Sequence, residues 1–159
     1  MKKTIAVLLA LAIIGTIIPA KVYYAPLAPD SKAIELNPRN AENYSGRSKV
    51  YEALGQDAEA EADKDEAIRL EPNLSEEYNS CGELKRRNGR YEEALADFNE
   101  AISRAAEDDA APYYINRGSL YQELKRCDEA SADFDKALSI AQTPEVKKEV
   151  EEHLAKLNQ

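Results

Sequence analysis

The 159-residue sequence has no tryptophan, only two cysteines and a single histidine. Two cysteines cannot staple a disulfide scaffold, and without clustered Cys and His residues we predict no metal site. Gly-rich phosphate loops and nucleophile elbows are also missing, so we predict neither an enzyme, a cofactor nor a small-molecule substrate. Acidic residues outnumber Lys and Arg by 30 to 21, and this excess disfavours nucleic-acid binding.

The first twenty residues contain no acidic side chain. Two lysines precede an apolar run over residues 5–18, and Ala20 is a small residue suited to cleavage. This order is typical of a secretory signal peptide. An uncleaved anchor is the alternative, because residues 4–20 match the lower limit of about 17–25 residues for a membrane-spanning helix. Either way we expect export to the periplasm or the cell exterior, with 1–20 as the only membrane contact and 21–32 as an irregular tether.

Beyond this segment, residues of the same kind recur 34 and then 36 positions apart. Within each unit the apolar and small residues fall three or four positions apart, in two segments joined by a short polar turn. We therefore expect a pair of helices in every unit. The recurring columns are Tyr44, Tyr78 and Tyr114; Ser48, Gly82 and Gly118; Ala60, Ala94 and Ala130; Asp63, Asp97 and Asp133; Ala67, Ala101 and Ala137; and Ile68, Ile102 and Leu138.

This pattern resembles the tetratricopeptide repeat, a helix–turn–helix unit of 34 residues. The three matching units are 41–74, 75–108 and 111–144. Lys64 and Lys85 depart from the family pattern, since each stands where an aromatic residue is usual. The resemblance implies an all-α fold in which stacked helix pairs form an α-solenoid.

Both ends of the array deviate from a complete repeat. Residues 33–40 echo the end of the first unit at the same 34-residue offset, and we interpret them as a truncated half-repeat. At the other end, Thr143 and Pro144 begin a segment whose apolar residues are spaced by three or four. We predict that this segment, 144–157, forms a capping helix that covers the last repeat.

The resemblance also implies that the first helix of each unit lines a concave groove, while the acidic second helices form a solvated outer layer. Charged, amide and hydroxyl side chains on the groove face suit hydrogen bonding to an extended peptide or a partner helix. An ordinary solvated helix face is the alternative. The predicted groove residues are Ser45, Lys49, Glu52, Asn79, Glu83, Arg86, Arg87, Ile115, Ser119 and Gln122.

We therefore predict a non-catalytic scaffold for a protein or peptide partner, exported or tethered to the membrane. A self-assembling structural subunit of an envelope or secretion complex is the alternative. Cys81 and Cys127 fall on different helix layers, and we expect two unpaired, buried or half-buried thiols rather than a disulfide. We expect His153 to be a solvated surface side chain.

Overall fold

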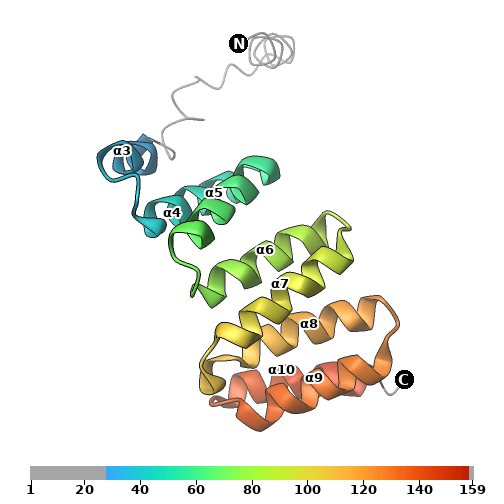
Figure 1. The fold of residues 1–159 in the computed structure, drawn as a ribbon. Helices are drawn as coiled ribbons and strands as arrows, with labels where there is room; N and C mark the ends of the chain where they lie inside the picture. Colours follow the sequence, from blue (N-terminus) through green and yellow to red (C-terminus); the bar gives the residue numbers. More distant parts are fainter. Residues whose placement is uncertain (1–27, 158–159) are drawn as a thin grey trace, which may run out of the picture.

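The computed structural model describes residues 28–157, and this part of the chain is all-α, without a strand (Figure 1). The predicted signal or anchor and most of the predicted tether lie outside the described residues. Within residues 28–157 no helix is both long and apolar enough to cross a bilayer. The helices are α3 (Ala28–Leu36), α4 (Ala41–Ala53), α5 (Asp57–Leu70), α6 (Ser75–Arg87), α7 (Tyr91–Arg104), the 3-10 helix η1 (Glu107–Asp109), α8 (Ala111–Glu123), α9 (Cys127–Ile140) and α10 (Pro144–Leu157).

The helices stack one after another, which confirms the predicted α-solenoid (Figure 1). Three antiparallel pairs, α4 with α5, α6 with α7 and α8 with α9, make up the array. The last helix, α10, packs against α9 and α8, and its Val150 is fully buried. In the second and third pairs the recurring small and aromatic residues lie at the contact between the two helices, so the repeat of the sequence corresponds to the repeat of the stack.

The first helix is longer than the sequence pattern indicates. We expected an irregular tether as far as residue 32, but α3 begins at Ala28. Pro29 falls in the first turn of this helix, where no intrahelical partner is needed for the missing N–H. Proline therefore marks the start of a helix at this point and does not break one.

A left-handed residue joins the two helices of each pair. Gly55 and Gly89 take this conformation in the first and second pairs, with φ of 69° and 74°. The third pair has Lys125 at the equivalent place, with φ of 61°. Glycine adopts this conformation without a steric penalty, whereas a side chain makes it less favourable.

A phenylalanine ring fills the space between the helices of the second and third pairs. Phe98 and Phe134 are fully buried, and each faces a glycine of the partner helix. A Cβ atom added to Gly82 would lie 2.6 Å from the Phe98 ring, and one added to Gly118 would lie 2.9 Å from the Phe134 ring. The small residues thus permit the close helix approach expected from the sequence.

The first pair is built differently. Lys64 occupies the place of the phenylalanine and has no exposed surface, although it is charged. Ser48 is buried opposite it in the place of the glycine. The apolar clusters of the described core all draw on residues from Tyr78 onward, and none includes a residue of α3, α4 or α5. Polar contacts therefore carry more of the packing at this end of the stack.

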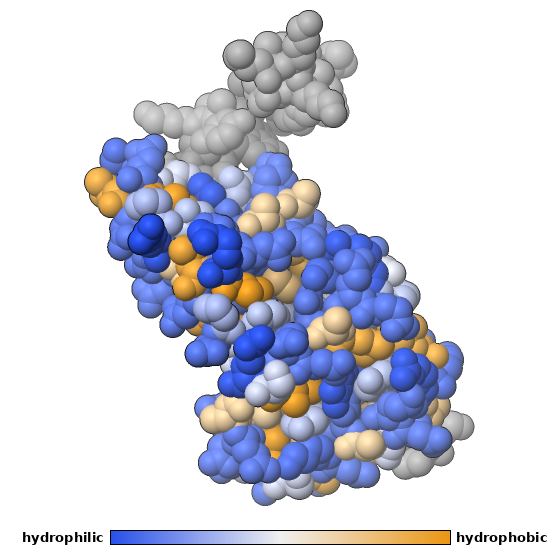
Figure 2. Space-filling view, in the orientation of Figure 1, coloured by the Kyte–Doolittle hydropathy of each residue, from blue (hydrophilic) through white to orange (hydrophobic). Residues whose placement is uncertain are grey.

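The surface seen in Figure 2 is mainly hydrophilic, with hydrophobic residues in separate groups. Leu36 at the end of α3 is 76% exposed and has the largest exposed fraction among the exposed large apolar side chains. It lies at the end of the array opposite to the one that α10 covers. At that end α3 packs against α4 but leaves Leu36 exposed.

Candidate partner-binding groove

An open hollow of about 580 Å³ lies between α6, α8 and α10. Five of the ten predicted groove residues line it, and they come from the second and third repeats: Glu83, Arg86, Ile115, Ser119 and Gln122. The remaining lining residues are Asn116, Glu123, Lys125, Glu149 and His153. The structure thus brings half of the predicted residues together at one place.

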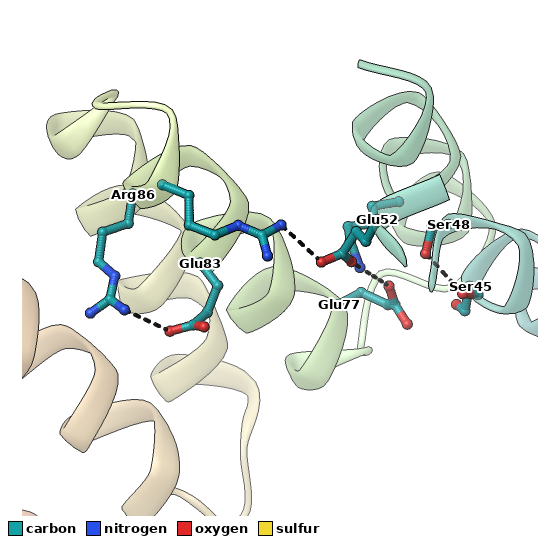
Figure 3. Close-up of polar contacts among 8 residues, drawn as sticks. Ser45, Ser48, Glu52, Glu77, Glu83 and Arg86 are labelled. Carbon is teal, nitrogen blue, oxygen red and sulfur yellow. Dashed lines mark hydrogen bonds and ion pairs between the residues drawn. The ribbon is translucent and has the colours of Figure 1, made fainter. Parts of the chain in front are cut away.

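The predicted residues of the first repeat lie outside this hollow. Glu52 is held from two sides, by Arg87 of α6 at 3.1 Å and by the buried Lys64 at 2.9 Å (Figure 3). Lys64 also faces Glu77 of α6 at 3.8 Å. These ion pairs connect the first and second repeats, so Glu52 and Arg87 already have partners within the chain.

The other two predicted residues of the first repeat have simpler surroundings. The Ser48 hydroxyl donates a hydrogen bond to the Ser45 carbonyl of its own helix at 2.8 Å (Figure 3). Lys49 is exposed and makes no hydrogen bond or ion pair with another described residue. Neither Ser45 nor Lys49 contributes to the hollow.

Two predicted groove residues are buried. Asn79 is only 8% exposed, and its side-chain oxygen accepts a hydrogen bond from Asn116 of α8 at 2.9 Å. Ile115 is 6% exposed and belongs to the apolar cluster around Phe134. These two positions are therefore not part of an open polar face: Asn79 is covered by its contact with α8, and Ile115 packs with Phe134 of α9 and Val150 of α10. Ile115 still forms part of the wall of the hollow.

Arg86 is the cation at the centre of the hollow's charged residues. Its guanidinium lies 3.7 Å from the Glu83 carboxylate, as Figure 3 shows, and 3.5 Å from that of Glu123. Both distances are longer than a charge-assisted hydrogen bond of about 2.7–2.9 Å. Arg86 is thus shared loosely between two carboxylates.

His153 is not the solvated side chain that the sequence predicts. Its ring stacks on Phe134 with 4.8 Å between the ring centroids, and its Nδ1 lies 3.4 Å from the Gln122 side-chain oxygen. Burial lowers the pKa of His153 and the Lys156 charge lowers it further, whereas Glu149 and Glu152 oppose the shift. The imidazole is therefore a half-buried part of the wall between α8 and α10.

The sequence contained a signal for the α10 side of the hollow that we did not use. Glu149 and His153 follow Ile115 and Ser119 by 34 residues, the same spacing that relates the repeats. Extending the groove positions into the capping helix would have identified both. Asn116 and Lys125 had no such signal, because neither falls at a groove position of the repeat pattern.

Outside the hollow, a partly buried ion pair joins the two helices of each repeat. In the first repeat Arg47 donates two hydrogen bonds to Asp63, each 2.7 Å long, and in the third Arg117 makes an equivalent pair of bonds to Asp133. The recurring aspartates thus include buried structural residues, in contrast to the solvated outer layer that we expected.

The second repeat replaces this arginine with Cys81, and Lys85 pairs with Asp97 at 2.7 Å instead. Burial raises the pKa of Asp97 despite the Lys85 hydrogen bond. Burial acts to lower the pKa of Lys85, but the hydrogen bond and charge of Asp97 outweigh it, so that pKa is raised as well. Burial also raises the pKa of Cys81 to about 12, which makes this thiol a poor nucleophile.

Neither cysteine forms a disulfide, as predicted. Cys81 is buried, but Cys127 is exposed at the start of α9, contrary to the expectation of a buried or half-buried thiol. In the described part of the chain no group of three or more His, Cys, Asp and Glu residues could hold a metal ion.

Comparison with known proteins supports the interpretation of the repeats. Residues 78–143 match the family model of the tetratricopeptide repeat. None of the curated proteins matches the sequence closely enough to count as a relative. The matched residues cover α7, α8 and α9 and most of α6, so they include two of the helices that form the hollow.

Several solved structures share the fold at low sequence identity. PilF of Pseudomonas aeruginosa is 21% identical with a TM-score of 0.74, over 87% of this chain and 63% of that chain. The TPR2B domain of yeast Sti1, in its complex with pHsp70, is 20% identical with a TM-score of 0.69, over 75% and 96%. The first TPR domain of Spaghetti, bound to the HSP90 peptide SRMEEVD, is 18% identical with a TM-score of 0.64, over 76% and 94%. At these identities the likeness establishes the fold, an all-α solenoid of the tetratricopeptide type, with residues 78–143 carrying the sequence match to that family.

Proposed function

We propose that this protein is a non-catalytic scaffold that binds a peptide or a helix of another protein in its groove. The observation that carries the proposal is the open hollow between α6, α8 and α10, which combines a buried apolar residue, Ile115, with hydroxyl, amide and charged groups. Hydrogen-bonding and charged groups around one apolar residue suit polar contacts to an extended peptide or to a partner helix. The peptide complexes of the Sti1 and Spaghetti domains support the same use of the fold.

Site-specific photo-crosslinking in cells tests this proposal. A photoreactive phenylalanine analogue at Ser119, which lines the hollow, should crosslink to another polypeptide on irradiation. The matched control is the same analogue at Ser139, an exposed serine of α9 outside the hollow. A crosslinked product at 119 and none at 139 is the expected result. Equal products at both positions, or none at 119, would contradict binding in the groove.

We further propose that the scaffold is exported or membrane-tethered. The basic start, the apolar run over residues 5–18 and Ala20 support this location. Fractionation of the producing cells followed by intact-mass measurement tests it. A soluble exported form lacking residues 1–20 identifies a cleaved signal, and a full-length form in the membrane fraction identifies an anchor. Full-length protein confined to the soluble cytoplasmic fraction would exclude both.

A self-assembling subunit is the second candidate, and the exposed Leu36 at the α3 end of the described stack favours it. Sedimentation analysis of the full chain in detergent should show concentration-dependent association, and Leu36→Lys should reduce it. A single monomeric species over the whole concentration range would exclude this candidate.

A further inference from the structure

The two halves of the groove differ in how far their charges are satisfied within the chain. In the half formed by the first repeat and α6, Glu52 of α4 is paired with Arg87 of α6 and with Lys64 of α5. The pair with Arg87 links α4 to α6. In the second half, the only ion pairs of the hollow are the two long contacts of Arg86 to Glu83 and Glu123, as far as residues 31–157 show. Glu52 and Arg87 are thus already paired within the chain, whereas the hollow between α6, α8 and α10 keeps carboxylates with long contacts or none.

Negative charge predominates among the groups that line the hollow. Three carboxylates, those of Glu83, Glu123 and Glu149, line the hollow together with the cations of Arg86 and Lys125. Burial and the Lys156 charge lower the pKa of His153, which favours its neutral form. One negative charge is therefore uncompensated.

Glu149 of the capping helix is the clearest case of an available carboxylate. It is exposed, and within the described residues it makes no hydrogen bond or ion pair, although its charge acts on His153. Glu123 is half exposed and has only the 3.5 Å contact to Arg86. These two residues come from different helices, α10 and α8, so they flank the hollow from two sides.

We propose that the partner segment carries a Lys or Arg side chain that enters this hollow and pairs with Glu123 and Glu149. This inference rests on the proposed function and specifies the chemistry of its partner. The buried Ile115 would contact the aliphatic stem of the entering side chain, since long basic side chains cover apolar surface with their methylene groups. Ser119 and Gln122 offer hydrogen-bonding groups beside it. The capping helix is then a wall of the binding site in addition to covering the last repeat.

Selection from a random peptide library tests the inference without knowledge of the natural partner. Phage-displayed 12-residue peptides are selected on the immobilised full chain in detergent, with Ser119→Trp used to identify those that bind in the hollow. We expect enrichment of Lys or Arg at one position of the peptides that Ser119→Trp no longer binds. If the peptides that Ser119→Trp no longer binds are acidic or purely apolar, binding in the groove stands but the proposal of a basic partner residue is overturned. The absence of any enriched peptide would overturn groove binding itself.

The selected peptide then allows a quantitative test by fluorescence anisotropy. Replacing its basic residue with neutral citrulline should weaken binding about tenfold. The double variant Glu123→Gln with Glu149→Gln should cause a similar loss, because it removes the same charge pairs from the protein side. Glu151→Gln is the matched control, because it removes one charge from α10 outside the hollow and should change affinity less than twofold. Equal losses of affinity in Glu149→Gln and Glu151→Gln would mean that only the net charge of the protein matters. That result would overturn the specific pairing with Glu149.

Discussion

The first and third repeats share an arginine–aspartate ion pair but differ in what fills the space beside it. In the third repeat Phe134 occupies this space against Gly118 and supports His153 of the capping helix. In the first repeat Lys64 occupies it against Ser48 and requires Glu52 and Glu77 for its charge. The same arrangement of two helices thus accommodates either an apolar ring or a charged side chain in the space between them.

The difference shows where each kind of filling is stable. An apolar ring needs only shape complementarity, whereas a buried ammonium needs carboxylates from more than one helix, because taking a charge out of water costs several kcal/mol. The carboxylates for Lys64 come from α4 and from α6, so the ionic filling joins two repeats. The two ends of the array should therefore respond differently to substitution.

The largest expected effect is at the apolar end. Phe134→Ala should lower the free energy of unfolding by about 4 kcal/mol, since it removes a fully buried ring and leaves a cavity below α10. Urea denaturation followed by circular dichroism measures this loss. Phe134→Leu is the control and should cost about 1–2 kcal/mol, since it keeps most of the apolar volume. Similar losses for both variants would mean that the cavity is not the cause.

At the ionic end, Lys64→Met should cost about 3 kcal/mol, because it leaves the buried Glu77 carboxylate without its cation. The double variant with Glu77→Gln should recover part of this loss by removing the orphaned charge. A second readout comes from Cys81, whose labelling by a thiol reagent in a Cys127→Ser background should accelerate if the junction opens more often. Unchanged stability in Lys64→Met would show that the ion pairs contribute nothing.

A smaller effect is expected where a ring and a glycine meet in the second repeat. Gly82→Ala should destabilise the protein by about 1–3 kcal/mol, because the new methyl group would overlap the Phe98 ring within a packed core. Ser48→Ala is the matched control in the first repeat and should have a lesser effect, since Ser48 already accommodates a side chain there. Thermal unfolding of the two variants gives the comparison. Equal shifts in melting temperature would contradict a role for ring–glycine contact.

The smallest effect concerns pH at the capping helix. Because the folded-state pKa of His153 is lowered, its contribution to stability is complete above about pH 6.5 and is lost as the pH falls through the folded-state value. The melting temperature should therefore decline more steeply from pH 7.5 to 5.5 in the wild type than in His153→Gln. Parallel declines would show that other groups account for the acid sensitivity.

The sequence was sufficient to predict the helices because their determinants are local and recur with the repeat. The spacing of Tyr44, Tyr78 and Tyr114 places the first helices, and the glycines at residues 55 and 89 mark two of the turns. It was insufficient for the groove, since burial of Asn79 depends on how closely α8 approaches α6, and burial of Ile115 on how α9 and α10 pack against α8. That approach is a property of the stack and leaves no sign in a single repeat. The 34-residue spacing places His153 on the groove side of α10, but its stacking on Phe134 depends on the packing of α10 against α9.

At Lys125, in the turn before α9, the backbone conformation favours glycine, whereas the lining of the hollow includes the lysine side chain. Glycine serves the first and second pairs at this position, and at Lys125 it would relieve a conformational penalty of about 1 kcal/mol. Lys125 also lines the hollow, so its side chain is available to a ligand there. A chain optimised only for folding would carry glycine at all three turns. Lys125→Gly should therefore stabilise the fold and at the same time remove a cation from the lining of the hollow, so a library that varies residue 125 alone would compare stability with the charge of the hollow.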